Sequence, residues 1–195
     1  MSTSEIKAED LLAVAGVKVA SVMSGIRYKN RLDLVLMEIA PGSTVAGVFT
    51  LNAFCAAPVQ LARQHLAQSG GAIRYLLINT GNANAGTGQK GLDDAAACCG
   101  FVAQHAGVAV SQVLPFSTGV IGENLPVAKV EAGVPCALSA LGDEWLQAAK
   151  GIMTTDTRPK ARSVRVDYHG KSVVITGIAK GAGMIKPNMA TLLSF

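Results

Sequence analysis

The sequence is poor in aromatic residues and in charge. Phe, Tyr and Trp together make up 5% of its 195 residues, and Asp, Glu, Lys and Arg make up 15%. Single-stranded nucleic-acid sites stack bases on aromatic side chains beside a basic groove, so we expect no nucleic-acid partner. The net charge is +4, and much of the positive charge gathers in one segment, at Arg158, Lys160, Arg162 and Arg165. We interpret this segment as a solvated turn and strand face; weak attraction of a small anionic substrate is the alternative.

Metal-binding and disulfide patterns are also missing. The four cysteines are Cys55, Cys98, Cys99 and Cys136, and none forms a C-x-x-C pair. This spacing does not match a zinc site, so we expect no metal. Cys98 and Cys99 lie in an apolar helical stretch, which predicts buried free thiols and a reducing compartment.

No targeting or membrane segment is evident. The first ten residues, "MSTSEIKAED", carry acids and lack the apolar core of a signal peptide. Residues 95–122 contain no Asp, Glu, Lys or Arg, but their longest apolar run, 95–103, is too short to cross a bilayer. We therefore expect a cytoplasmic protein with no membrane partner.

The remaining composition is typical of a packed α/β domain, because half of the residues are hydrophobic and 21 are glycine. Periodicity and turn residues predict the following elements: strands at 31–40, 43–50 and 72–79; helices at 58–71, 92–107 and 143–153; a strand followed by a loop at 113–126; a helix interrupted by Pro135 at 127–142; and a hairpin at 163–179 that turns at 169–171. This order predicts a mixed layered α/β sandwich with helices packed on sheet.

Two weaker signals do not support an active site. Gly86, Gly88 and Gly91 match the letters of the dinucleotide fingerprint, but no acidic residue follows at the distance that a ribose contact needs. A nucleotide-binding module is kept as an alternative hypothesis, and no cofactor is expected. The three histidines lack a G-x-S-x-G partner, so we expect satisfied or exposed side chains.

Two threonines are better candidates. Thr118 and Gly119, at the end of a predicted strand, can offer a hydroxyl and a backbone N–H to a developing oxyanion, although spacing alone favours a plain turn. Thr191 can act as a nucleophile if cleavage after Ala190 frees its α-amine to serve as base. Gly181, Gly183 and Pro187 allow the tight backbone path that such cleavage needs, while the simpler interpretation is a strand threonine.

Several motifs resemble those of one family, in the right order along most of the chain. They are "LLINTGNANAGTGQKGLDDA" (76–95), "PFSTGVIGENLP" (115–126), "IMTTDTRPK" (152–160) and "KGAGMIKPNMATLLSF" (180–195). They are similar to the ornithine acetyltransferases, the bifunctional glutamate N-acetyltransferases of arginine biosynthesis. The resemblance implies an N-terminal-nucleophile-like, self-processing fold.

The resemblance also implies how the chain is divided. Residues 1–190 correspond to the α-chain region, with Ala190 as its last residue, and 191–195 correspond to the start of the β chain. Family members are about twice this long, so we expect that the rest of the enzyme is absent here and that this fragment alone is inactive. An α2β2 assembly with the β chain of the same precursor is expected.

Roles at the site follow from the same resemblance. Thr191 corresponds to the nucleophile that takes acetyl from N2-acetylornithine and passes it to glutamate, and some members also use acetyl-CoA. Thr118 and Gly119 correspond to the oxyanion-hole pair, and Thr154 and Lys180 to substrate-binding residues. We expect Lys180 to pair with the substrate carboxylate. A related self-processing amidohydrolase or aminopeptidase with the same nucleophile is the alternative.

Overall fold

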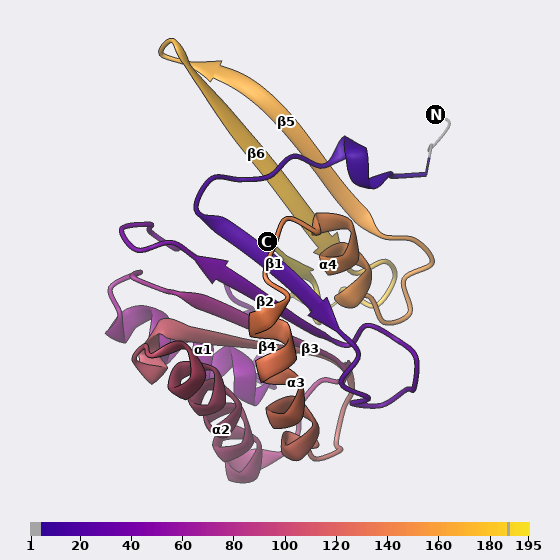
Figure 1. Ribbon diagram of the computed structural model, residues 1–195. Coiled ribbons are helices and arrows are strands. Elements are labelled where there is room, and N and C mark those ends of the chain that lie inside the picture. The colour runs from indigo at the N-terminus through magenta and orange to yellow at the C-terminus, as the bar shows by residue number, and fades with distance from the viewer. Residues whose placement is uncertain (1–4, 187) are drawn as a thin grey trace.

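The computed structural model describes residues 5–186 and 188–195. Figure 1 shows three layers: a group of helices, the central β-sheet, and a layer made of a short helix and a long hairpin. The mixed α/β architecture with helices packed on sheet, predicted from the sequence, is therefore confirmed.

The central sheet consists of four strands in sequence order, with two antiparallel pairs followed by one parallel pair. The strands are β1 (Val17–Val22), β2 (Leu34–Ile39), β3 (Tyr75–Asn82) and β4 (Val113–Val120). A parallel pair needs a crossover connection, which here contains the longest helix, α2 (Gly88–Ala106). Because β3 and β4 run in the same direction, their ends lie side by side, with Thr80 opposite Thr118 and Gly81 opposite Gly119.

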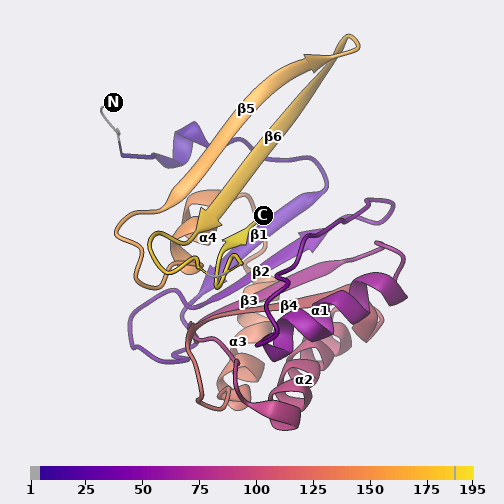
Figure 2. The same cartoon turned by 180° about the vertical axis from the view of Figure 1, so that it is seen from behind.

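A group of helices covers one face of this sheet, as Figures 1 and 2 show from opposite sides. They are α1 (Ala57–Gln68), α2 and α3 (Val127–Ser139). Leu34, Leu36 and Leu77 point toward them and join a buried core with Cys98 and Cys99. Both thiols are free, as the sequence predicted, and burial raises the pKa of Cys98 to about 12. These thiols therefore stay protonated at neutral pH.

The other face of the sheet packs against the short helix α4 (Trp145–Gly151) and the base of the hairpin. Side chains alternate along a strand, so Val35 and Ile78 point to this side. They form a second core with Trp145, Ile152 and Ile178. The three-layer arrangement thus depends on two separate apolar cores, one on each face of the central sheet.

The second sheet contains the predicted hairpin, β5 (Lys160–Tyr168) and β6 (Lys171–Lys180), and the short strand β7 (Leu193–Ser194). His169 and Gly170 make the turn with positive φ angles of 51° and 73°. The far half of the hairpin extends beyond the body of the molecule (Figures 1 and 2). One of its faces exposes a row of apolar side chains: Val164, Val166, Tyr168, Val173 and Ile175.

One predicted strand is absent from the two sheets, and one strand of the central sheet was not predicted. Residues 43–50, predicted to be a strand from Val, Thr and Phe, enter neither sheet, and Val48 is 88% exposed. The strand β1 was not predicted, because its sequence "VKVASV" mixes polar and small residues with apolar ones. Its core position comes from pairing with β2, a tertiary effect that overrides local propensity.

Two helix predictions also need correction. The helix predicted at 92–107 begins earlier, at Gly88, so Asp93 and Asp94 lie in its second turn rather than its first. The helix α3 continues through Pro135 instead of being interrupted there. Single-turn 3₁₀ helices occur at Ala8–Asp10 and Val110–Gln112. Pro187, invoked above for the backbone path, lies outside the described residues.

None of the helices within the described ranges has the length and apolar character that crossing a membrane requires.

A core substitution should reveal how much the second core contributes to stability. Ile152→Ala removes a side chain with no exposed surface, and we expect a loss of about 2–5 kcal/mol in unfolding free energy. Val48→Ala, at an exposed position, should change it by less than about 0.5 kcal/mol. Urea unfolding of both variants measures the difference, and equal stabilities would contradict the assigned core.

Candidate active site

The loop that follows α4 is held in place from two sides. On one side, the Arg31 guanidinium donates to the carbonyl oxygens of Met153 (2.7 Å) and Thr154 (2.9 Å). On the other, the backbone N–H of Thr154 donates to a carboxylate oxygen of Asp156 at 3.4 Å. This bracing fixes Thr154, which was predicted to bind substrate.

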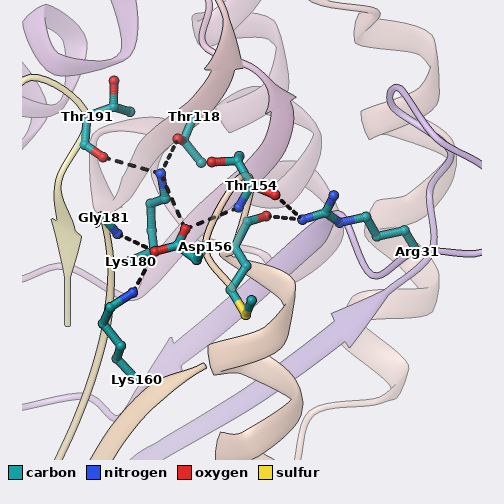
Figure 3. A network of polar contacts seen from close by, with 9 residues as sticks. Arg31, Thr118, Thr154, Asp156, Lys160, Lys180, Gly181 and Thr191 are labelled. Atoms are coloured by element: carbon teal, nitrogen blue, oxygen red, sulfur yellow. Dashed lines mark hydrogen bonds and ion pairs between the residues drawn. The ribbon is translucent and has the colours of Figure 1, made fainter. Parts of the chain in front are cut away.

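The carboxylate of Asp156 is the centre of the polar network in Figure 3. Its side chain is 1% exposed, and it accepts hydrogen bonds from Lys160 Nζ (2.6 Å) and from the Gly181 N–H (2.8 Å). Burial alone raises the pKa of this carboxyl. The Lys160 ammonium and the two backbone N–H groups outweigh burial, so the pKa falls from the ordinary 3.8 to about 2.

Lys180, the last residue of β6, brings the predicted residues together. Its ammonium donates to Thr118 Oγ1 at 3.2 Å and to the Thr191 carbonyl oxygen at 3.5 Å, and it lies 3.8 Å from Asp156 Oδ2. The residue is 5% exposed. Burial lowers the pKa of Lys180, the Asp156 carboxylate raises it, and the Lys160 ammonium lowers it again, with a net shift downward.

Thr118 and Gly119 lie at the end of β4, where the sequence placed them. Because Thr118 Oγ1 already accepts from Lys180, its own hydroxyl hydrogen is available to donate to another oxygen. Gly119 has a φ of 140°, and a Cβ there would lie 2.3 Å from the carbonyl carbon of Gly81. Only glycine fits this close approach of β4 to β3.

A cavity of about 130 Å³ borders this site. Gly119 and Thr154 form part of its wall, together with Arg27, Tyr28 and Arg31. Arg27 is paired with Glu123 at 2.6 Å, and Asp33, at the same cavity, accepts from two backbone N–H groups. The cavity therefore connects two residues predicted separately, Gly119 and Thr154.

Thr191 is the first residue after the predicted cleavage point, and it is partly buried. Its carbonyl oxygen faces Lys180, whereas its side chain points away from Lys180 and Thr118 in Figure 3. Thr118, Lys180 and Thr191 thus share one site although more than 60 residues separate the first two. Their roles in binding and catalysis stay predictions.

Three members of this network were not predicted from the sequence: Arg31, Asp156 and Lys160. Lys160 had been assigned to a solvated basic face, but its ammonium pairs with Asp156. The signal that was available is the spacing of Asp156 and Lys160, an acid and a base four residues apart. Burial of Asp156 depends on the return of β6, which short-range sequence does not reveal.

The glycine-rich loop at 84–91 has a structural explanation. The Asn84 amide donates to the Gly91 carbonyl oxygen, and the Thr87 hydroxyl donates to Asn84 Oδ1. A Cβ at Gly91 would lie 1.9 Å from Thr87 Oγ1, so this glycine is needed for packing. These contacts account for the loop without a bound nucleotide.

The histidines also lie away from the site chemistry. His65 is buried, with Nδ1 2.7 Å from the Val113 carbonyl oxygen, and His105 Nδ1 is 2.8 Å from the Phe101 carbonyl oxygen. His169 is in the hairpin turn. Across residues 5–186 and 188–195, no three His, Cys, Asp or Glu side chains gather into a metal-binding group.

Comparison with known proteins points to one family. Residues 18–195 match the family model described as the ArgJ family. The arginine biosynthesis bifunctional protein ArgJ of Methylococcus capsulatus is 54% identical over 186 residues, which cover 95% of this chain and 45% of that protein. The ArgJ protein of Pseudomonas syringae pv. tomato is 55% identical, over 93% of this chain and 44% of its own length. The chain thus spans less than half the length of these relatives.

Two solved structures share the fold. The ArgJ protein of Bacillus halodurans has a TM-score of 0.82 and 33% identity, covering 91% of this chain and 92% of its own. The ornithine acetyltransferase of Mycobacterium tuberculosis, solved with ornithine, has a TM-score of 0.83 and 35% identity, covering 95% and 98%. These matches confirm the predicted fold class of the N-terminal-nucleophile type.

The low pKa of Asp156 predicts a pH-dependent contribution to stability. A carboxyl whose folded pKa lies below its unfolded pKa stabilises the fold above the unfolded value and loses this effect as pH falls through the folded value. We therefore expect Asp156→Asn to lower the unfolding free energy at pH 7, and the gap to the parent to close between about pH 4 and pH 2. Urea unfolding across this range measures it. Asp93→Asn, at an exposed acid, is the control and should change the unfolding free energy at pH 7 by less than about 0.5 kcal/mol.

Gly119→Ala should disturb the strand pair at the site. The added Cβ forces β3 and β4 apart, and we expect a loss of about 1–3 kcal/mol in unfolding free energy. This loss adds to the cost of holding an alanine at the positive φ angle of Gly119. Gly122→Ala is the matched control, because Gly122 also has a positive φ but no atom within 4 Å of the added Cβ. Equal losses for the two variants would contradict the close approach.

Proposed function

We propose that this chain, which belongs to the ArgJ family, supplies the α-chain region and the first β-chain residues of a self-cleaving acetyltransferase. The enzyme would move acetyl from N2-acetyl-L-ornithine to L-glutamate. The observation that carries this proposal is the position of Lys180 between Thr118 and Thr191. Lys180 contacts the Thr118 hydroxyl and the Thr191 backbone carbonyl oxygen, which supports assigning both threonines to one site.

The first proposed reaction is cleavage of the Ala190–Thr191 bond. Thr191 Oγ attacks the Ala190 carbonyl carbon, the C–N bond breaks, and the hydroxyl proton goes to the departing nitrogen. Water then hydrolyses the ester, leaving a carboxylate on Ala190 and a free α-amine on Thr191. Ala190 is exposed, so water can reach the ester.

The second proposed reaction is acetyl transfer. The Thr191 α-amine takes the hydroxyl proton as Oγ attacks the acetyl carbonyl of acetylornithine, and ornithine leaves with that proton on its amine. The amine of glutamate then attacks the acetyl-threonine ester and regenerates the hydroxyl. The Thr118 hydroxyl and the Gly119 N–H would stabilise the oxyanion in both steps, and such donors contribute about 10²–10³ in rate each.

Substrate binding is proposed for Thr154 and Lys180. Both acetyl carriers have an α-carboxylate that a lysine ammonium can pair with, and the solved complex of the Mycobacterium tuberculosis relative with ornithine supports a substrate of this type. The cavity beside Gly119 and Thr154 offers space next to the reacting group. Acetyl-CoA is included in the proposal as a second acetyl donor, and the partner is the β chain in an α2β2 assembly.

Cleavage can be tested by intact mass. The full-length polypeptide that carries these residues should appear as two chains that separate before Thr191, and Thr191→Ala should leave one uncut chain. Ser194→Ala, three residues further on, is the control and should be cut like the parent. Cleavage of the Thr191→Ala variant at the same bond would overturn the mechanism.

Dependence on glutamate, the acetyl acceptor, distinguishes the proposed acetyltransferase from the alternative amidohydrolase. The processed enzyme should form N-acetylglutamate from acetylornithine only when glutamate is present. Release of free acetate without glutamate would instead indicate an amidohydrolase. Replacing acetylornithine with acetyl-CoA in the same assay tests the second donor.

A further inference from the structure

The backbone just before the proposed cleavage point has an unusual conformation. Asn188, Met189 and Ala190 have φ angles of 47°, 68° and 38°, which place three consecutive non-glycine residues in the left-handed region. Asparagine tolerates this region, but methionine and alanine have no side-chain hydrogen bond to favour it. Such strained residues persist only where surrounding contacts hold them, and they gather at functional sites.

The bond to be cut lies at the middle of a tight turn. The Leu192 N–H donates to the Met189 carbonyl oxygen at 2.8 Å, which closes a four-residue turn over 189–192. Ala190 and Thr191 are the two central residues of this turn. The peptide bond between them is therefore at its apex, with Ala190 exposed.

The turn is anchored at both ends. On its C-terminal side, Phe195 exchanges two backbone hydrogen bonds with Ile178 of β6, at 2.9 and 3.0 Å. On its N-terminal side, the Thr50 hydroxyl donates to the Asn188 carbonyl oxygen at 2.6 Å, and the Leu51 N–H donates to Asn188 Oδ1 at 2.8 Å. Figure 2 shows the segment between β2 and α1, which contains Thr50, running alongside the C-terminal part of the chain.

The contacts at Asn188 matter because the described residues shortly before it lie at the surface. Residues 182–186 are all exposed. Without an anchor at Asn188, this side of the turn could relax into an extended path, which Met189 and Ala190 prefer. The segment at 50–51 is itself outside both sheets, so the contact is not a by-product of strand pairing.

We propose that Thr50 and Asn188 are positioning residues for self-cleavage. Their hydrogen bonds form a clamp that holds the turn in the strained geometry from which Thr191 Oγ attacks Ala190. Cleavage follows the steps proposed for the Ala190–Thr191 bond, and the backbone strain is released when the C–N bond breaks. This inference rests on the proposed function, because it presupposes that the bond is cut.

The test compares cleavage rates in the full-length polypeptide by intact mass against time. Asn188→Ala and Thr50→Val remove the clamp, and each should slow cleavage by about tenfold or more. Asn188→Asp keeps an oxygen that accepts from Leu51, and Thr50→Ser keeps the hydroxyl, so both should cut within about threefold of the parent. Asn52→Ala is the matched control, because its side chain accepts a hydrogen bond from the Phe54 N–H within the same segment.

A thermal unfolding curve of each uncut precursor separates positioning from folding. The clamp variants should melt within a few degrees of the uncut Thr191→Ala precursor while cutting more slowly. If Asn188→Ala and Thr50→Val cut as fast as the parent, or if the Asp and Ser variants are equally slow, the clamp is wrong. A parent that is never cut before Thr191 overturns the proposed function, and the clamp with it.

Discussion

The arrangement of the site depends on one buried carboxylate. Burying an ionised acid is unfavourable unless hydrogen bonds and opposite charges replace water, and Asp156 meets this requirement with groups from three parts of the chain. It joins the loop after α4 to the first residue of β5 and to the end of β6. Since Lys160 and Ala179 are paired across the hairpin, both strands are fixed at the point where they leave the body of the protein. The carboxylate therefore helps to set the position of the Lys180 ammonium, which contacts both Thr118 and Thr191.

The second core gives this polar network its place against the central sheet. Side chains two positions apart on a strand share a face, so Ile178 and Lys180 point the same way along β6. Ile178 is buried with Trp145 and Ile152, which brings that face of β6 toward the sheet. The next residue on the face is Lys180, and it meets Thr118 at the end of β4. The apolar packing of Ile178 thus positions the Lys180 ammonium. The site forms where the central sheet meets the sheet that contains the hairpin.

Much of the fold was predictable from local sequence, and much of the site was not. The buried run of β3, the strand β4 and the hairpin around Gly170 all have strong local signals, and the structure confirms them. The strand β1 lacks such a signal, whereas residues 43–50 have one but find no place in either sheet. At the site, motif resemblance identified Thr118, Lys180 and Thr191, which the fold brings together. Asp156 has the sequence context of an ordinary surface turn, and only the return of β6 about 25 residues later buries it.

The hairpin also has a consequence for what this part of the protein can bind along its outer edge. Within residues 5–186 and 188–195, β7 and Phe195 pair with the last three residues of β6, whereas residues 171–177 of that strand pair with β5 alone. Beside this open edge lies the row of exposed apolar side chains that includes Val164, Val166 and Ile175. An uncovered strand edge next to an apolar face is a template for adding strands from other molecules. The element that carries Lys180 into the site therefore also presents, in the described residues, an edge and an apolar face to which a further strand can be added.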